Sequence, residues 1–181
     1  MHSLVCRGEY CSFFIDSCLK MSGLTELFVS LPQIYNKKSM SYNLLKGKRG
    51  IVFGALNEQS IAWKVAEKAV EEGAVITLSN TPVAVRMGEV SALAEKLNCE
   101  VIPADATSVE DLENVFKRSM EVLGGKIDFV LHSIGMSPNV RKKRTYDDLD
   151  YDMLNKTLDI SALSFHKMIQ SAKKLNAINE Y

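Results

Sequence analysis

Three polar stretches carry the residue types that a nucleotide ligand needs, and each directly follows an apolar run. After the first run, Gly54 is followed by a five-residue insertion and then by Ser60 and Ile61. A glycine lets the chain turn tightly, and a serine at a helix start can cap the helix or bond a phosphate oxygen. Free N–H groups and the helix dipole attract phosphate at such a position. The spacing predicts a phosphate loop with one glycine, although it also fits a strand-to-helix turn without a ligand.

The other two polar stretches suggest contacts to a base and to the reacting end of a ligand. Asp105 can accept a hydrogen bond from an adenine amine, and Ala106 can pack beside the ring. A lone aspartate is also common in turns and caps. The stretch His132-Ser-Ile-Gly135 ends in a glycine that allows close backbone approach. A histidine in this position is more often structural than catalytic.

The elements that must position these residues alternate between strand and helix. Strands are expected at 51–53, 75–78, 100–102 and 127–132, and helices at 60–72, 83–97, 109–123 and 149–175. Such alternation predicts an α/β fold with a Rossmann-like, doubly wound parallel sheet of order 3-2-1-4. In this arrangement the three polar stretches meet at the carboxyl edge of the sheet, where cofactors bind. The buried face of the first helix is expected to carry Ile61, Val65, Ala69 and Val70.

The composition excludes several classes of function. The formal net charge is +0, which gives no electrostatic case for a nucleic acid or a membrane surface. No apolar run approaches the ~20 residues needed to span a bilayer. Cys6, Cys11 and Cys18 lie near His2, but their spacing matches no common zinc pattern, so we predict no metal site. The remaining sequence is typical of a reduced, intracellular protein.

The chain divides into two unequal parts. Residues 1–39 show no sustained periodicity and fit a signal peptide poorly, because they lack a basic start and a small-residue cleavage site. Met40 lies about ten residues before the first strand and resembles a natural start. We interpret 1–39 as a leader of doubtful authenticity or a disordered tail, and 40–181 as an incomplete NAD(P)-binding Rossmann domain.

Taken together, the motifs resemble one family closely. Gly54-x5-Ser60-Ile-Ala-Trp63, Asp105-Ala106, His132-Ser-Ile-Gly135 and Asp159-Ile-Ser161 are similar to the NADH-dependent enoyl-[acyl-carrier-protein] reductases of bacterial type II fatty-acid synthesis. These are divergent members of the short-chain dehydrogenase/reductase superfamily. The resemblance runs from about residue 45 to residue 175, and the long loop before Ser60 is its most specific part.

The resemblance implies a set of cofactor contacts. Gly54, Ser60 and Ile61 would hold the pyrophosphate, and Asp105 and Ala106 the adenine. On the nicotinamide side, the expected lining is Ser133, Ile134 and Gly135. Thr81 would lie near the adenosine ribose, and Ser137 near the acyl substrate. No acidic residue follows the second strand, and Arg86 lies close to it in sequence, but we expect NADH rather than NADPH.

The resemblance also implies a reaction and partners. The family reduces trans-2-enoyl-[acyl-carrier-protein] to acyl-[acyl-carrier-protein] in the cytoplasm, as a homotetramer. A tyrosine and a lysine seven positions later carry its chemistry, and no tyrosine in this chain has a lysine at that distance. We therefore expect the chain to lack the catalytic pair and strands 5–7, to bind dinucleotide weakly and to have no reductase activity of its own.

Two other functions remain open from the sequence. One is a different short-chain dehydrogenase/reductase, such as a ketoacyl reductase, although the one-glycine loop argues against it. The other is a non-catalytic dinucleotide-binding module that kept only the cofactor half. Tight NADH binding by a soluble, monodisperse chain would favour the module.

Overall fold

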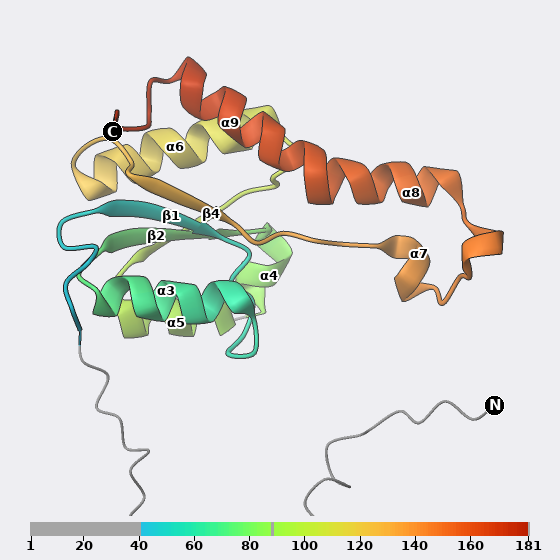
Figure 1. Cartoon of the computed structure of the whole chain (residues 1–181), viewed down its shortest axis with the longest axis horizontal. Helices are drawn as coiled ribbons and strands as arrows, with labels where there is room; N and C mark the ends of the chain where they lie inside the picture. Colours follow the sequence, from blue (N-terminus) through green and yellow to red (C-terminus); the bar gives the residue numbers. More distant parts are fainter. Residues whose placement is uncertain (1–40, 88, 181) are drawn as a thin grey trace, which may run out of the picture. The chain divides into compact units, whose positions relative to one another are not determined.

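A parallel four-stranded sheet forms the centre of the protein in a computed structural model that describes residues 41–87 and 89–180. The strand order is β3-β2-β1-β4, as predicted (Figure 1). The strands are β1 (Arg49–Phe53), β2 (Val75–Asn80), β3 (Glu100–Pro103) and β4 (Phe129–His132). The leader, Met40 and the three clustered cysteines lie outside the described residues.

Helices cover both faces of this sheet (Figure 1). One face carries α3 and α5, and the other carries α6 and α9. The helices are α3 (Ile61–Glu71), α4 (Pro82–Arg86), α5 (Glu89–Leu97), α6 (Val109–Leu123), α7 (Pro138–Arg141), η1 (Tyr146–Asp148), α8 (Tyr151–Leu158), η2 (Asp159–Leu163) and α9 (Ser164–Lys174). None of the helices in the described part of the chain is both long and apolar enough to cross a bilayer.

Each face of the sheet has its own apolar core. Both cores combine side chains from the strands, including β1, with side chains from the covering helices. The α6–α9 side contains Ile51, Phe53, Ile102, Leu112, Val115, Phe116, Ile127 and Met168. The α3–α5 side contains Val52, Ala62, Trp63, Ala66, Ile76, Leu78, Val90 and Leu93. Because β1 contributes to both cores, the loop that leaves its carboxyl end starts from a fixed position.

The predicted buried face of α3 is correct at Ala69, which is buried, and wrong at Ile61 and Val65. Ile61 is 75% exposed and Val65 is 36% exposed, whereas Ala62, Trp63 and Ala66 are buried. Alanine has little side chain to lift the helix away from the sheet, so the alanine face packs most closely. The larger β-branched residues therefore lie beside that contact. The predicted ends are correct, since Ser60 caps the helix by accepting a hydrogen bond from the Trp63 N–H.

The single helix predicted at 83–97 is two helices. Thr81 caps α4 by accepting from the Ala84 N–H, and Pro82 occupies its first turn, where proline is tolerated. The sequence carries Gly88 between α4 and α5, and glycine is a poor helix former. Val90 and Leu93 are fully buried on α5.

The long helix predicted at 149–175 contains a change of helix type. A π-helical segment, η2, joins α8 to α9. Such segments are rare, and they occur frequently at functional sites. In Figure 1, α9 packs along α6, while α8 extends beyond the sheet toward α7.

Strand β4 is shorter than predicted, and Ile127, which precedes it, makes a separate pairing. Ile127 forms an isolated parallel bridge with Ile178. The Ile127 N–H donates to the Ala177 carbonyl oxygen at 2.8 Å, and the Asn179 N–H donates to the Ile127 carbonyl oxygen at 2.9 Å. The edge of β4 that faces away from β1 is therefore partly paired.

An ion cluster joins α3 to α5 and makes the fold sensitive to acid. The Glu67 carboxylate accepts from Lys96 at 2.6 Å, from Lys64 at 3.2 Å and from the Trp63 indole at 3.1 Å. The Lys96 ammonium is the main cause that lowers the pKa of Glu67 to about 2.

Because the folded state holds this pKa below its usual value near 4.3, the cluster stabilises the protein above that value. We expect the contribution to be lost as the pH falls from about 4.3 to about 2. Urea denaturation at a series of pH values should show a smaller acid-dependent loss of stability for Glu67→Gln than for the unmodified chain. Identical pH dependence in the two proteins would contradict this assignment.

Candidate functional site

A cavity of about 470 Å³ lies at the carboxyl edge of the sheet. Residues from the ends of all four strands line it, as expected of an open α/β sheet. Seven of the ten residues singled out from the sequence are in its wall: Gly54, Thr81, Asp105, Ala106, Ser133, Ile134 and Gly135. The cavity is thus the point where the three polar stretches meet.

Gly54 holds the loop after β1 against the loop after β4. Its φ is +90°, a conformation that residues with side chains rarely adopt. A Cβ atom at this position would lie 2.1 Å from the Ser133 carbonyl oxygen. The Ser133 N–H donates to the Phe53 carbonyl oxygen at 3.2 Å, which keeps the two loops together. Glycine is required here for both its conformation and its size.

Ser60 and Ile61 do not line this cavity. The Ser60 hydroxyl donates to the Asn57 carbonyl oxygen at 2.7 Å and accepts from the Leu56 N–H at 3.2 Å. The loop before α3 is therefore closed by its own hydrogen bonds. Ser60 and Ile61 line a separate, largely apolar groove along α3 that includes Phe129.

The adenine end predicted from the sequence is a tight turn between β3 and α6. The Asp105 Oδ1 accepts from the Thr107 N–H at 2.9 Å and from the Thr107 hydroxyl at 2.8 Å. Asp111 in the first turn of α6 accepts from the Asp105 N–H at 2.8 Å. Both hydrogen bonds of the Asp105 carboxylate are made by Oδ1. Ala106 is buried beside it.

The loop after β4 is held in place by the π-helical segment. The Ser161 hydroxyl accepts from the Met136 N–H at 3.0 Å and donates to the Met136 carbonyl oxygen at 3.3 Å. Gly135, in the same loop, has no atom within 4 Å of the position that a Cβ would take. The cavity wall is therefore open at Gly135 and fixed at Met136. Ser161 had been singled out only as part of a motif, with no contact predicted for it.

Three charged side chains in the cavity wall had no predicted contact. Arg141 from α7 and Lys156 from α8 were missed by the sequence reasoning, and Asp159 from η2 was named only as part of a motif. Asp159 accepts from Lys167 at 2.8 Å, and Lys167 also donates to the Thr107 carbonyl oxygen at 3.0 Å. The three charged residues lie 80 or more positions after Ile61 in sequence (141 − 61 = 80), so no local spacing indicates that they share a cavity with Gly54.

Ser137 lies just outside the cavity wall. Its hydroxyl caps α7 by accepting from the Val140 N–H at 3.5 Å. The neighbouring Met136 is in the wall. The predicted substrate contact therefore remains a prediction about a residue at the margin of the cavity.

His132 has the structural role that the sequence favoured. Its Nε2 lies 2.8 Å from the Ser164 Oγ, and the Ser164 hydroxyl lies 2.6 Å from the Ile160 carbonyl oxygen. The hydroxyl has one proton, which goes to Ile160, so Ser164 accepts from Nε2–H. The ring also packs edge-on against Phe165, with centroids 5.5 Å apart. Burial lowers the pKa of His132 below its usual value.

This environment predicts how His132 titrates. Since its pKa is lowered on folding, the neutral ring stabilises the protein above pH 6.5, and protonation at lower pH reduces that contribution. We expect ring-proton NMR to report an apparent pKa below 6.5 for His132. A pKa for His132 at or above 6.5 would contradict the assignment.

The residues that form the cavity are also those that comparisons with known proteins match. A family profile described as Enoyl-(Acyl carrier protein) reductase covers residues 54–180. The chain belongs to this enoyl-[acyl-carrier-protein] reductase family. The match begins at Gly54 and includes the loop between β1 and α3.

Individual enoyl-[acyl-carrier-protein] reductases show the same relationship. The enzyme named enoyl-[acyl-carrier-protein] reductase [NADH] 1 of Rhizobium meliloti is 35% identical over 73% of this chain and 48% of its own length. The FabI of Rickettsia bellii is 33% identical over 75% of this chain and 52% of its own. The chain thus spans about half the length of the relatives it matches.

Solved structures of the family agree with the fold. FabI from Alistipes finegoldii superposes with a TM-score of 0.75 at 73% identity, covering 77% of this chain and 53% of that protein. Its complex with NADH gives the same TM-score and identity over 49% of that chain. The α/β fold and the 3-2-1-4 sheet therefore match the N-terminal part of FabI reductases.

Within the described residues, no group of three or more histidine, cysteine, aspartate or glutamate side chains could hold a metal ion. Cys99, the described cysteine, is half-buried on the far side of the sheet from the cavity, and burial raises the pKa of its thiol to about 11. A thiol with this pKa is protonated at neutral pH and is a poor nucleophile.

Proposed function

We propose that this chain is the cofactor-binding part of an NADH-dependent enoyl-[acyl-carrier-protein] reductase. The enzyme would reduce trans-2-enoyl-[acyl-carrier-protein] to acyl-[acyl-carrier-protein] during fatty acid elongation in the cytoplasm. One observation carries the proposal: the cavity at the carboxyl edge of the sheet gathers residues from all four strand ends around Gly54. The names of the relatives, which specify NADH, support the choice of cofactor.

The cavity residues fit a dinucleotide in a definite direction. At one end, the Asp105 carboxylate would accept from the adenine amine, and Ala106 would pack on the ring. At the other end, the open backbone at Gly135 would admit the nicotinamide. Bound NADH would supply the hydride for the β-carbon of the enoyl thioester. Ser161 would keep the Ser133–Met136 loop in place by its two bonds to Met136.

Two further assignments complete the proposal. Ser60 and Ile61 would reach the pyrophosphate through the N-terminal backbone of α3 rather than through the cavity wall. Thr81 caps α4 at the mouth of the cavity, next to the ribose position expected for the family. We also propose that the complete enzyme is a homotetramer, that Ser137 contacts the acyl group, and that residues 40–181 act as a single domain.

Isothermal titration of the purified chain with NADH and with NADPH tests the proposal. We expect NADH to bind more tightly than NADPH. Asp105→Ala should weaken NADH binding by about tenfold, since a hydrogen bond to a charged group contributes roughly 1.5–3 kcal/mol. Asp147→Ala is the control, because that aspartate is exposed in η1 and does not line the cavity. Equal loss in both variants, or no binding by the unmodified chain, would contradict the proposal.

One sequence observation favours a second candidate, a non-catalytic dinucleotide-binding module. Within these 181 residues no tyrosine is followed by a lysine seven positions on, which is the spacing of the family's catalytic pair. Reduction of a crotonyl thioester by the purified chain would contradict the module. Tight NADH binding without any turnover would favour it.

A further inference from the structure

Lys167, in the first turn of α9, connects two walls of the cavity without lining it. Its ammonium donates to the Asp159 Oδ1 at 2.8 Å and to the Thr107 carbonyl oxygen at 3.0 Å. Asp159 belongs to η2 and Thr107 to the turn that follows β3, and both residues line the cavity. One cation therefore bridges two segments of the cavity wall that are far apart in the sequence.

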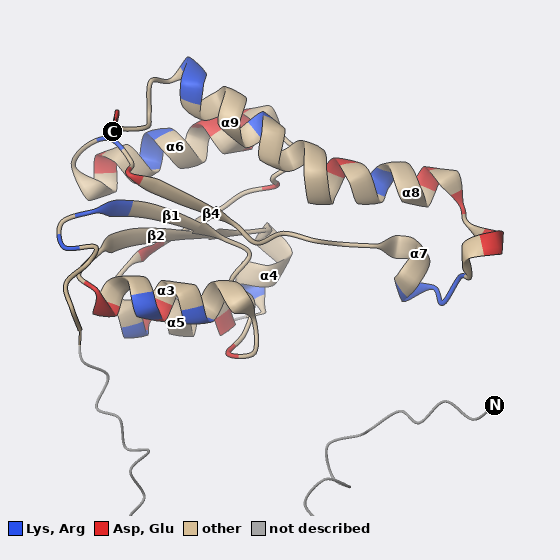
Figure 2. Cartoon of the chain, in the orientation of Figure 1, with Lys and Arg blue, Asp and Glu red and all other residues tan. Residues whose placement is uncertain are grey.

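The Lys167 side chain is more enclosed than those of the other lysines that form ion pairs in the described part of the chain. It is 27% exposed, whereas the others are between 49% and 69% exposed. Cations recur along α8 and α9 (Figure 2), so its place on the helix does not distinguish Lys167. Its enclosure and its two partners do. Because exposed ion pairs contribute little, an enclosed bridge is expected to have the larger effect.

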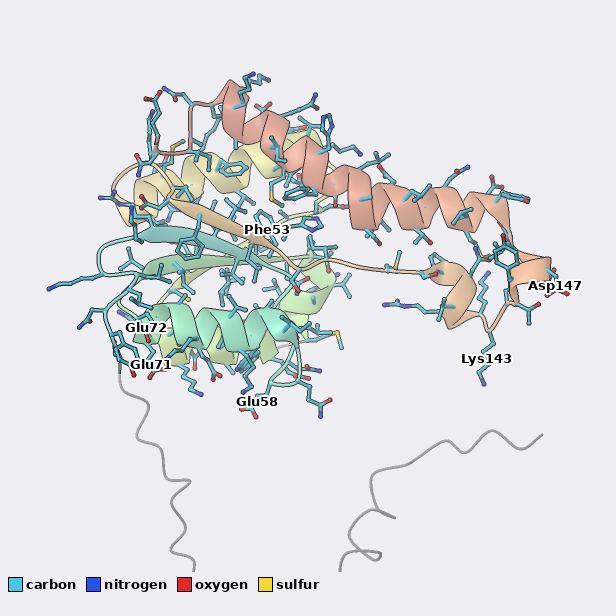
Figure 3. The ribbon with its side chains drawn as sticks, viewed as in Figure 1. Phe53, Glu58, Glu71, Glu72, Lys143 and Asp147 are labelled. Atoms are coloured by element: carbon cyan, nitrogen blue, oxygen red, sulfur yellow. The ribbon has the colours of Figure 1, made fainter. Side chains whose placement is uncertain are left out.

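The backbone that carries Lys167 is also fixed in place. The next residue, Met168, is 2% exposed and belongs to the same apolar core as Phe53. Phe53, which is labelled in Figure 3, is the last residue of β1 and lines the cavity. Since the start of α9 is anchored on the core beside the cavity, the Lys167 ammonium reaches its two partners from a defined position.

The charge of the cavity wall gives Lys167 an electrostatic effect. The wall contains two cations, Arg141 and Lys156, and two carboxylates, Asp105 and Asp159. A dinucleotide would bring the negative charge of its pyrophosphate to this wall. The Lys167 ammonium offsets the charge of Asp159 at 2.8 Å, which leaves the surroundings of the cavity favourable to an anion. Without Lys167, the Asp159 carboxylate would repel the ligand.

The second partner of Lys167 gives it a positional effect. The turn assigned to the adenine is shaped by its own hydrogen bonds, since Asp105 Oδ1 accepts from the Thr107 N–H and the Ser108 N–H donates to the Asp105 carbonyl oxygen at 3.0 Å. These bonds set the shape of the turn but do not tie it to α9. The bond from Lys167 to Thr107 does, and it thereby fixes where the turn lies relative to η2.

We propose that Lys167 is a positioning residue for the dinucleotide: it holds the adenine turn in place relative to η2 and neutralises Asp159 for the ligand's pyrophosphate. Lys167 acts through Thr107 and Asp159 and does not itself touch the ligand. This inference rests on the proposed function and deepens it, because it names a residue behind the cavity wall that sets the affinity for the cofactor.

Isothermal titration with NADH and with AMP compares Lys167→Met with Lys174→Met. Lys174 is the matched control, because it lies on the same helix and its ammonium pairs with Glu113 on α6 at 2.6 Å, and neither residue lines the cavity. We expect Lys167→Met to lose about tenfold in affinity for each ligand, because two charge-assisted hydrogen bonds are removed. The control should bind both ligands as the unmodified chain does.

Salt and a second substitution separate this role from a general loss of structure. Salt screens the repulsion between Asp159 and the ligand, so the affinity ratio between the unmodified chain and Lys167→Met should fall as salt is raised. Lys167→Met/Asp159→Asn should recover at least about threefold in NADH affinity over Lys167→Met, because the uncompensated carboxylate is removed. A variant that bound poorly because it was misfolded would show neither recovery, and that result would overturn the inference.

Hydrogen exchange without ligand tests the position of the turn directly. We expect the Thr107 and Ser108 amides to exchange faster in Lys167→Met than in the unmodified chain, and to be unchanged in Lys174→Met. Unchanged exchange in both variants, equal losses of affinity in both, or a loss for NADH that spares AMP would overturn the inference alone. Failure of the unmodified chain to bind NADH would contradict the proposed function, and the inference with it.

Discussion

Replacing Gly54 with alanine is expected to abolish measurable NADH binding and to destabilise the domain. The left-handed φ of +90° costs a residue with a side chain roughly 1–2 kcal/mol. In addition, the new Cβ would lie 2.1 Å from the Ser133 carbonyl oxygen, so the loop after β4 would have to move. That loop forms the predicted nicotinamide wall. Urea denaturation and NADH titration of Gly54→Ala measure the two effects separately.

A second glycine separates backbone strain from displacement of the loop. Gly124 has a φ of +70°, but no atom lies within 4 Å of the position that its Cβ would take. Gly124→Ala should therefore cost only about 1–2 kcal/mol and leave NADH affinity unchanged. If Gly54→Ala behaved like Gly124→Ala in both assays, the contact with Ser133 would not matter for the cofactor site.

Phe116→Ala is expected to cause the largest loss of stability among single side-chain truncations considered for this domain. The Phe116 side chain is 0% exposed, on the α6 face that packs over Ile51 and Phe53. Truncation of a buried phenylalanine costs about 3–5 kcal/mol, because it removes apolar contacts and leaves a cavity. This is a large share of the roughly 5–15 kcal/mol that stabilises a typical domain. The free energy of unfolding from urea titration measures the loss.

Phe165→Ala is the matched control for this prediction. Phe165 is 49% exposed, and its described ring contact is the edge-on packing with His132. Such a pair contributes about 0.5–1.5 kcal/mol, so the variant should lose no more than about that amount. Similar losses in the two variants would mean that the α6 face does not form the main core of this side of the sheet.

The fold was predictable because its signals are local and repeated. The apolar runs that became β1 to β4 and the capping residue Ser60 each mark an element boundary within a few residues. The errors arose where tertiary packing, rather than the local sequence, determines the burial or the geometry of a helix. In α3, the choice between the alanine face and the β-branched face depends on how closely the helix approaches the sheet. In η2, nothing in the apolar periodicity indicates one wider turn.

The candidate site was predictable to the extent that its residues follow strands. Gly54 and Ser133 lie directly after β1 and β4, and Asp105 lies two residues after β3, so the order of the sheet brings them together. Arg141 and Lys156 come from helices that follow the last strand. Their place in the cavity wall depends on the course of the chain through α7 and back along α8, which no spacing encodes. The roles assigned to the ten predicted residues stay predictions until ligand binding is measured.

The bridge between Ile127 and Ile178 would fix the alignment of a strand that paired with the outer edge of β4. In a parallel ladder the first pair sets both direction and register for every later pair. A shift of one residue would exchange the two faces of an entering strand, because side chains alternate with a period of two. Ile178 already has its partner, so a strand that continued from it along β4 would have one alignment available. The outer edge of β4 would thereby accept a neighbouring strand in a single register.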